Sequence, residues 1–285
     1  MNTTILDRHM LAILDLALAE DIGAGDVTAM STVPPESIAT ATMAAKQPGV
    51  IFGLEVAKAA FQRVDSHLAV HLLAEDGAFV EAMTAIASIE GSARSILKAE
   101  RVALNFIQHL SGVATIASIY VSAIEGTNAR IVDTRKTTPG MRVLEKQAVA
   151  AGGAHNHRFG LFDGILIKDN HLAAIGGPDR IATAVSRARQ SAPHTLKVEV
   201  EVTTLDEVKA ALAAGAEIIM LDNMSITEMS EAVRLIGGQA MVEASGGITL
   251  QNVAQVAGTG VNLISIGSLT HSAPALDISL DFAIH

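Results

Sequence analysis

Residues 196–222 read LKVEVEVTTLDEVKAALAAGAEIIMLD, and this stretch decides the fold. Valines alternate with charged residues at its start, a segment rich in alanine and leucine follows, and a second apolar run closes it. We interpret the three parts as a strand, a helix and a strand, with a capping box from Thr204 to Glu207 and a helix stop at Gly215. Such a unit predicts two parallel strands joined by a right-handed crossover.

The same pattern of a strand followed by a helix repeats along the second half of the chain. Six apolar segments read as strands, and the last four of them begin roughly every 20 to 25 residues. This period is typical of βα units, so we expect a closed or nearly closed α/β barrel, with a doubly wound open sheet as the alternative. The six predicted strands are 129–134, 163–168, 196–202, 216–222, 239–245 and 261–267.

The first half of the chain has a different pattern. An amphipathic helix is expected over 6–20, and short apolar runs with turn signals flank a helical pattern, as in an α+β layer of antiparallel strands and helices. A long helix should begin at Ser92, with a kink or break at Ser111 and Gly112. The other expected segments are strands within 38–53 and 68–90, a helix over 54–65, and a return segment over 269–285 that packs elsewhere.

The composition excludes several classes of protein. The chain has 285 residues, 49% of them hydrophobic, which is ample for a sizeable core. Its net charge of −10 argues against nucleic acid or an anionic membrane surface as the main partner. There is no cysteine, which suits a reducing, cytoplasmic setting. We predict neither a signal peptide nor a transmembrane helix.

Acidic residues gather at the expected strand ends, where a barrel of this type carries its chemistry. Glu199 and Glu201 share one face of their strand, and Asp222 ends the next strand. Carboxylates from adjacent strand ends are a plausible Mg²⁺ site. The alternative is that one of the glutamates pairs with Lys168 or Lys197.

Glycine-rich segments follow the last two predicted strands. They read SGG at 245–247 and IGS at 266–268. Glycines there let backbone N–H groups approach a phosphate, and the final two strands usually form the phosphate corner of a barrel.

Basic residues are concentrated where an anion could bind. Arginine and lysine together suit a ligand with several anionic groups. A zinc site on His155, His157 and His171 is the competing idea, but no cysteine helps it and Arg158 would repel a cation. The basic set is Arg135, Lys136, His157, Arg158 and Lys168.

The residues alone therefore predict a barrel enzyme that holds a phosphorylated substrate and a second, acidic substrate. No Ser-His-Asp arrangement is evident, and there is no cysteine to act as a nucleophile. We expect a reaction driven by positioning and electrostatics.

These motifs closely resemble the quinolinate phosphoribosyltransferase family, also called the nicotinate-nucleotide pyrophosphorylases, over nearly the whole chain. Marks of the family also occur before the barrel, as ALAEDIGAGDVT, PGVIFGLEVAKAAF and AERVALNFIQHLSGVAT. The barrel motifs that carry the resemblance are DTRKTTPG, EKQAVAAGGAHNHRFGLFDGILIKDNH, VEVEV, IIMLDN, EASGGI and ISIGSLTHSAPALDISLDF.

The resemblance implies an α/β sandwich over 1–110, completed by 269–285, and an incomplete parallel α/β barrel over 111–268. It implies transfer of phosphoribosyl from phosphoribosyl pyrophosphate to quinolinate with decarboxylation. The products would be nicotinate mononucleotide, pyrophosphate and CO₂, with Mg²⁺ as cofactor, in NAD biosynthesis. It also implies a homodimer in which Arg101 reaches the neighbouring subunit's site.

The resemblance assigns a role to each matching residue. Those implied for quinolinate are Arg101, Arg135, His157, Arg158 and Lys168. Those implied for the pyrophosphate, ribose and Mg²⁺ are Lys136, Glu201 and Asp222, with Lys136, Lys168, Glu201 and Asp222 as the catalytic set. Those implied for the 5′-phosphate are Ser245, Gly246, Gly267 and His271.

The sequence departs from the family pattern at a few positions. Ala154 stands where a third glycine is common, Gln147 where an aromatic is frequent, and Met83 where glycine is frequent. Two alternatives stay open. One is a phosphoribosyltransferase for another pyridine, as in the ModD-like proteins found with molybdate transporters, although the intact NHR and IKDNH segments favour the quinolinate enzyme. The other is a non-catalytic anion-binding regulator.

Overall fold

The computed structural model describes residues 3–284, and the chain divides into two compact units. The second unit comprises Ile119–Lys136 and Ala154–Ser268, and the first comprises the rest. The segment from Leu269 onward therefore lies with the first unit. The boundary drawn from the sequence at residues 110 and 111 gave Thr137–Gly153 to the barrel, whereas in the structure this segment belongs to the first unit.

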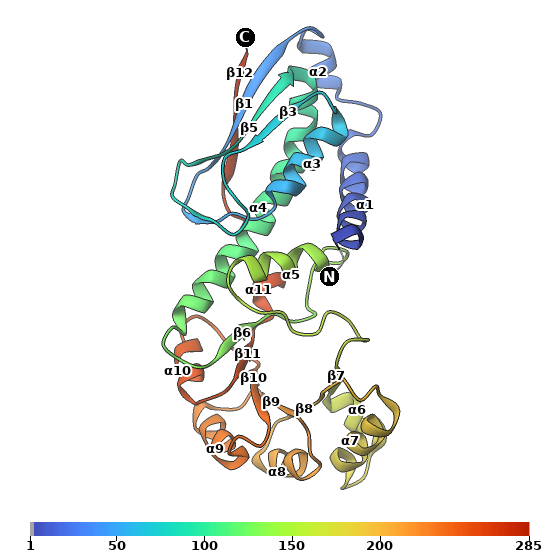
Figure 1. Cartoon of the computed structure of the whole chain (residues 1–285), viewed down its shortest axis with the longest axis vertical. Coiled ribbons are helices and arrows are strands. Elements are labelled where there is room, and N and C mark those ends of the chain that lie inside the picture. Colours follow the sequence, from blue (N-terminus) through green and yellow to red (C-terminus); the bar gives the residue numbers. More distant parts are fainter. Residues whose placement is uncertain (1–2, 285) are drawn as a thin grey trace. The chain divides into compact units, whose positions relative to one another are not determined.

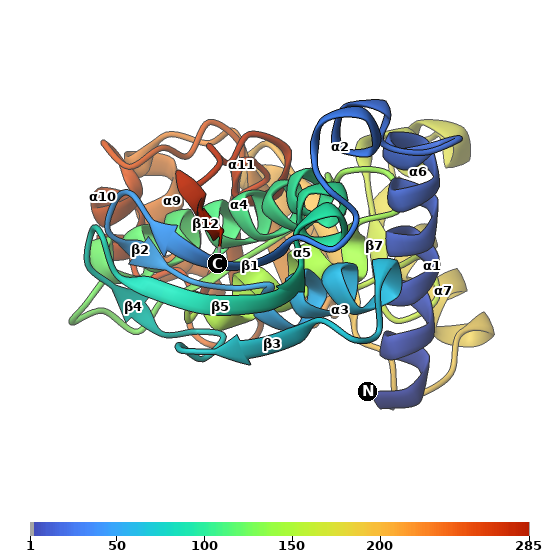
Figure 2. The same cartoon turned by 90° about the horizontal axis from the view of Figure 1, so that it is seen from above.

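An antiparallel sheet forms the centre of the first unit, with the strand order β12-β1-β5-β3. The C-terminal strand β12 pairs with β1 along its length, so the expected return segment completes this sheet. Helix α4 runs alongside the sheet (Figures 1 and 2). The strands are β1 (Ile38–Ala45), β3 (Ala69–Leu72), β5 (Ala85–Ser92) and β12 (Ile278–Ile284), and a separate pair is β2 (Gly49–Val50) and β4 (Phe79–Val80).

One helix of the first unit departs from expectation. Helix α4 runs unbroken through Ser111 and Gly112, so the predicted break is wrong. Ser111 is fully buried, and its hydroxyl accepts a hydrogen bond from the N–H of Phe52. A Cβ at Gly112 would lie 2.0 Å from the carbonyl oxygen of Pro274, so glycine serves close packing there. The helices are α1 (Thr3–Ile22), α2 (Val27–Thr32), α3 (Leu54–Val64), α4 (Ala93–Ala123) and α5 (Arg142–Ala151).

Helix α4 is long and apolar enough to cross a membrane by length and composition alone. The mean hydropathy of its most apolar 18 residues is 1.4. However, 61% of that window is buried inside the structure, which is the behaviour of a core helix.

Six parallel strands form the second unit, in the order β6-β11-β10-β9-β8-β7. Within the described residues β6 and β7 do not pair with each other, so the barrel is incomplete, as predicted. All six expected strands are present: β6 (Arg130–Val132), β7 (Ile165–Ile167), β8 (Val198–Val202), β9 (Ile218–Asp222), β10 (Met241–Ser245) and β11 (Leu263–Ser265).

Helices cover the outer side of this sheet in chain order (Figure 1). Alternation along β8 gives the reason, because Val198, Val200 and Val202 are buried on one face and the glutamates occupy the other. The helices are α6 (Asp169–Ile175), α7 (Arg180–Ser191), α8 (Leu205–Ala213), α9 (Ile226–Ile236) and α10 (Val253–Gly258). The short helix α11 (Ser268–His271) follows β11, and from Leu269 onward it belongs to the first unit.

The cap of α8 differs slightly from the predicted capping box. The hydroxyl of Thr204 accepts from the N–H of Glu207, as expected. The carboxylate of Glu207, however, accepts from the N–H of Thr203, one residue before the predicted donor. The helix still begins where the sequence places it.

Candidate active site

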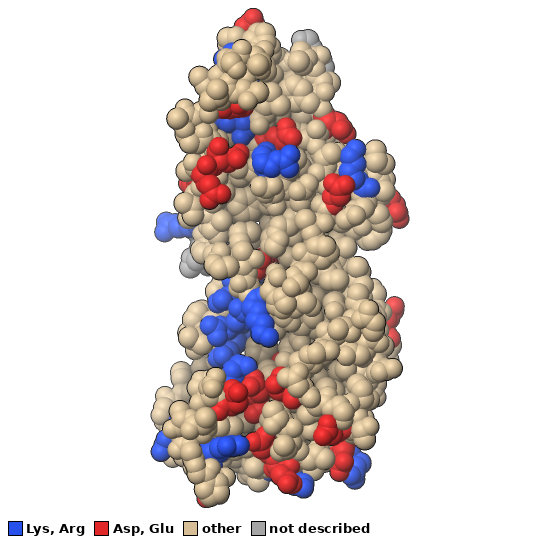
Figure 3. Space-filling view, turned by 180° about the vertical axis from the view of Figure 1, so that it is seen from behind, with Lys and Arg blue, Asp and Glu red and all other residues tan. Residues whose placement is uncertain are grey.

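A cavity of about 640 Å³ lies in the second unit, where the strands β6 to β11 end. Residues from all six of these strand ends line it together, as expected for a barrel of this kind. On one face of the molecule, Lys and Arg side chains gather in a patch beside a group of Asp and Glu side chains (Figure 3). The predicted site residues that line the cavity are Arg135, Lys136, His157, Arg158, Lys168, Glu201, Asp222, Ser245 and Gly246.

Three predicted residues are not among those that line this cavity. Gly267 follows β11, two residues after Ser265, which does line the cavity. Arg101 and His271 belong to the first unit. Arg101 lies on α4 with its side chain exposed, and His271 ends α11 with Nδ1 2.6 Å from the hydroxyl of Ser272. The roles of these three residues stay predictions.

A buried aspartate holds the segment that carries His157 and Arg158. The side chain of Asp133, at the end of β6, is fully buried and accepts a hydrogen bond from the N–H of His157 at 2.7 Å. The N–H of Asp133 in turn donates to the carbonyl of His155 at 3.1 Å. This segment therefore lies beside β6 without being a regular strand.

Two arginines come close enough to repel each other. Burial lowers the pKa of Arg158, and the charge of Arg135 lowers it further. The guanidinium of Arg158 is held by a hydrogen bond from Nη1 to the carbonyl of Gly164 at 2.9 Å. Two neighbouring guanidinium groups on a cavity wall suit a ligand with two carboxylates, because each can bind one carboxylate bidentately.

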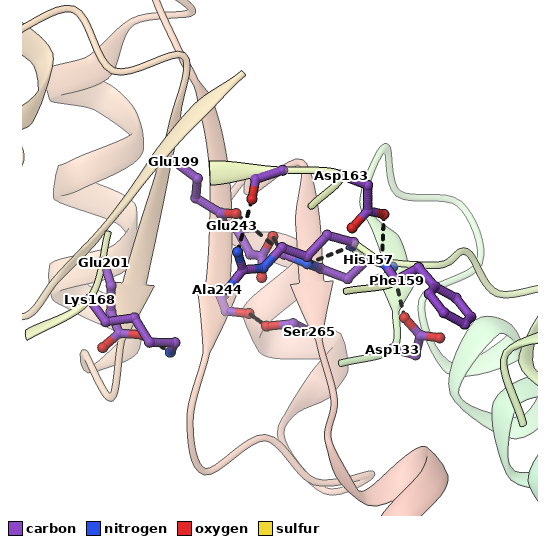
Figure 4. Close-up of polar contacts among 12 residues, drawn as sticks. Asp133, His157, Phe159, Asp163, Lys168, Glu199, Glu201, Glu243, Ala244 and Ser265 are labelled. Carbon is purple, nitrogen blue, oxygen red and sulfur yellow. Dashed lines mark hydrogen bonds and ion pairs between the residues drawn. The ribbon is translucent and has the colours of Figure 1, made fainter. Parts of the chain in front are cut away.

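Lys168 stands at the end of β7 and forms an ion pair with Glu201 of β8 (Figure 4). Its backbone N–H donates to Nδ1 of His171 at 2.9 Å, so that imidazole caps the start of α6. The alternative of a zinc site on the three histidines loses this ligand atom. The other alternative, that a glutamate pairs with Lys168, is correct for Glu201.

Glu201 and Asp222 end adjacent strands and both line the cavity. Oδ2 of Asp222 accepts from Nδ2 of Asn223 at 2.8 Å, which leaves Oδ1 for another partner. Two carboxylates that line one cavity, beside the glycine turn at Gly246, offer the oxygen donors that Mg²⁺ takes. The donor set therefore fits this ion.

The turn after β10 requires glycine. Gly246 has φ +86°, and a Cβ there would lie 2.3 Å from Oδ1 of Asn223. Asn223 is itself left-handed, with φ 55°, and its N–H donates to the carbonyl of Ser245 at 2.9 Å. The turn thus brings bare backbone to the cavity wall, as phosphate binding needs.

A buried acidic pair is the feature that the sequence reasoning missed. Glu243 of β10 is fully buried and Glu199 is 4% exposed. Nε2 of His157 lies 3.2 Å from Oε2 of Glu199 and 3.4 Å from Oε2 of Glu243 (Figure 4). Glu199 thus pairs with His157, and the suggested pairing with Lys168 or Lys197 is wrong for this residue. Alternation would have found Glu243, since it shares a strand face with Ser245.

The three side chains are buried in contact with one another, and this shifts the pKa values of His157 and Glu199. Burial raises the pKa of Glu199 above its ordinary value, and the hydrogen bond with His157 offsets this only partly. Burial opposes protonation of His157 and lowers its pKa, whereas the contacts of Nε2 with Glu199 and Glu243 raise it and outweigh the effect of burial.

The strand ends, with their arginines, carboxylates and glycine turn, define an α/β-barrel enzyme for anionic, phosphorylated substrates. Residues 26–111 match the family described as "Quinolinate phosphoribosyl transferase, N-terminal domain", and residues 113–281 match its C-terminal domain. The chain belongs to the quinolinate phosphoribosyl transferase family.

Individual relatives are similar to this chain over most of its length. A probable nicotinate-nucleotide pyrophosphorylase from Bacillus subtilis is 45% identical over 265 residues, which cover 93% of this chain and 90% of the relative. The enzyme of that name from Mycobacterium leprae is 42% identical, over 93% and 94% of the two chains. A solved structure from Francisella tularensis has a TM-score of 0.91 at 39% identity, covering 97% and 96%. The predicted family, fold and enzyme class are confirmed.

Proposed function

We propose that the barrel cavity is where this protein, a decarboxylating quinolinate phosphoribosyltransferase of NAD biosynthesis, carries out its reaction. Quinolinate and phosphoribosyl pyrophosphate would bind there together, and nicotinate mononucleotide, pyrophosphate and CO₂ would leave. The observation that carries this assignment is the lining of one cavity by Arg135, Arg158 and Lys168 beside Glu201 and Asp222. The basic residues suit the two carboxylates of a diacid, and the carboxylates suit the metal ion and ribose of an activated sugar phosphate.

Quinolinate would bind at the basic side of the cavity. Arg135 and Arg158 repel each other in the free protein, and a dicarboxylate between them would relieve that repulsion. Lys168 would supply a third positive charge. Holding both carboxylates fixes the ring so that its nitrogen faces the sugar, which removes much of the entropic cost of the reaction.

The sugar phosphate would bind at the acidic and glycine-rich side. The turn at Ser245 and Gly246 would receive the 5′-phosphate, with Gly267 and His271 as further predicted contacts. Lys136 would neutralise charge on the departing pyrophosphate. Glu201 and Asp222 would hold Mg²⁺, directly or through water, and when bound the ion would neutralise pyrophosphate oxygens.

No protein nucleophile is needed for the loss of CO₂. Ribosylation leaves a positive charge on the ring nitrogen, which stabilises the electron pair that the breaking carbon–carbon bond leaves on the adjacent ring carbon. That carbon then takes up one proton, which completes nicotinate mononucleotide. The arginines keep the second carboxylate of the pyridine bound, so the ring stays in place. A reaction of this kind needs charged side chains and backbone turns that bind the substrates, and these are what the cavity provides.

The test is direct. Purified protein is mixed with MgCl₂, phosphoribosyl pyrophosphate and quinolinate, and nicotinate mononucleotide and CO₂ are measured. Nicotinate replaces quinolinate in the comparison reaction, because it lacks the second carboxylate. Product in the quinolinate reaction but not in the nicotinate reaction supports the proposal. Product from nicotinate alone would favour a transferase for another pyridine, and tight anion binding without any product would favour the regulator.

Arg101 carries the proposal that the protein works as a homodimer. Its side chain is exposed on α4, beside Glu100 at 3.9 Å, and the family resemblance gives it a role in the neighbouring subunit's site. Co-expression of Arg101→Ala with Lys136→Ala tests this arrangement, because mixed dimers regain one intact site. Random pairing should recover about a quarter of wild-type activity. A monomeric mass, or no recovery from proven mixed dimers, would contradict it.

We also propose a cytoplasmic location. The chain contains no cysteine, as suits a reducing compartment. Among its relatives are bacterial enzymes, and the plant relatives are named as chloroplastic or mitochondrial. Fractionation of cells that express the protein would test the location.

A further inference from the structure

Glu199 and Glu243 form a buried acidic pair on the inner face of the barrel. They come from β8 and β10. Oε1 of Glu199 and Oε1 of Glu243 are buried without a hydrogen-bond partner, and Oε2 of Glu243 has only the long contact of 3.4 Å with Nε2 of His157. A buried carboxylate with so little hydrogen bonding costs stability. The pair therefore calls for a role that offsets this cost.

The direction of one hydrogen bond fixes the proton of His157. The backbone N–H of Arg158 donates to Nδ1 at 2.8 Å, and a backbone N–H can only donate. The two glutamates favour a second proton on the ring, at Nδ1, but that proton would face the N–H of Arg158 at 2.8 Å and be repelled by it. We assign the single proton to Nε2 because this form satisfies the contacts of both ring nitrogens.

Both ring nitrogens of His157 are then occupied. Nε2–H points at the two glutamates, Nδ1 accepts from Arg158, and the backbone N–H of His157 donates to Asp133. The imidazole thus joins the acidic pair to the peptide of Arg158. This arrangement also disfavours a metal ion here, although the three ligand atoms lie within 4.8 Å of one another, since a protonated Nε2 cannot be a ligand.

The charges point the same way. Burial and the charge of Arg135 disfavour the charged form of Arg158. The charge of the Glu199 carboxylate favours that form. Before the dicarboxylate arrives, Glu199 and Asp163 are therefore the carboxylates that favour the charged form of Arg158. Glu243 and His157 line the same cavity as both arginines.

We propose that Glu199 and Glu243 are positioning residues for quinolinate, which hold the Nε2–H form of His157 and through it the backbone and side chain of Arg158. This inference rests on the proposed function and extends it to two residues that need not touch the substrate. It also gives His157 an indirect role in place of the direct contact that the family resemblance implies.

The test compares the binding of the two substrates to the full-length protein by titration calorimetry. Glu243→Gln keeps the size of the side chain and removes its charge. We expect its Kd for quinolinate to rise by about tenfold, the usual effect of losing one charge-assisted hydrogen bond, while the Kd for phosphoribosyl pyrophosphate stays within about twofold. The matched control is Glu217→Gln, at the start of the neighbouring strand β9, which should change neither.

A second measurement needs no variant that alters the core. Nitrogen-15 NMR of the histidines in the wild-type protein reports which ring nitrogen of His157 bears the proton. A proton on Nδ1, or equal loss of both substrates in Glu243→Gln, would overturn the inference. Unchanged quinolinate binding in a folded Glu243→Gln would do the same. If the wild-type protein itself fails to bind quinolinate, the proposed function fails instead.

Discussion

Lys168 and Glu201 form an ion pair between the ends of β7 and β8, although we assign them to different substrates. While the ammonium of Lys168 occupies the carboxylate, Glu201 is a poorer ligand for a cation. We therefore expect Lys168→Met to bind Mn²⁺, as a substitute for Mg²⁺, about three- to fivefold more tightly than the wild type, the range for a partly exposed pair. Titration calorimetry without substrates measures this. Lys209→Met, which removes an exposed pair with Asp206, is the control and should leave the affinity unchanged. Equal affinities in all three proteins would contradict the competition.

Turnover should depend on Mg²⁺ through Glu201 and Asp222. Because these carboxylates end adjacent strands at one cavity, the double alanine variant should lose Mg²⁺-dependent turnover almost completely. Initial rates at a series of MgCl₂ concentrations measure the effect. Asp206→Ala, an exposed carboxylate on α8, serves as control. Full wild-type activity in excess EDTA would rule the ion out.

Arg158→Ala should separate the two substrates. The guanidinium lies beside Arg135 at the basic side of the cavity, so we expect quinolinate affinity to fall by about thirtyfold or more, with phosphoribosyl pyrophosphate within about twofold. Calorimetric titration of each substrate decides the matter. Arg187→Ala, on the exposed side of α7, controls for loss of a positive charge. Equal losses for both substrates would contradict the assignment.

The turn after β10 gives a matched pair of glycine variants. Both Gly246→Ala and Gly247→Ala place a side chain at positive φ, 86° and 61°. Only at Gly246 does the new Cβ meet Oδ1 of Asn223 at 2.3 Å, because the corresponding distance from Gly247 is 4.0 Å. We expect the KM for phosphoribosyl pyrophosphate to rise more in Gly246→Ala than in Gly247→Ala. A similar rise in both would mean that backbone strain, and not the clash, limits binding.

The sequence predicted the barrel and its strand ends well, because the alternation of β8 and the period of the βα units are local patterns. Its failures are long-range. By sequence alone Ser111 and Gly112 predict a helix break. In the structure they pack against Phe52 and Pro274, which come from distant parts of the chain. Glu243 was overlooked for a similar reason. Its role depends on His157, which lies far away in the sequence on an irregular segment.

Met83 offers a test of backbone strain in the first unit. The family resemblance predicts glycine as a frequent residue at this position, and in the structure the φ of Met83 is 66° with the side chain 66% exposed. A non-glycine residue in this region costs about 1–2 kcal/mol, whereas glycine costs about 0.4–1 kcal/mol through the entropy of the unfolded chain. Met83→Gly should therefore stabilise the protein by about 0.5–1 kcal/mol, seen as a higher Tm in scanning calorimetry. Met83→Ala removes the same side chain but keeps the strain, so its Tm should stay near that of the wild type. If Met83→Ala gains as much as Met83→Gly, the effect comes from removing an exposed apolar side chain and not from the backbone.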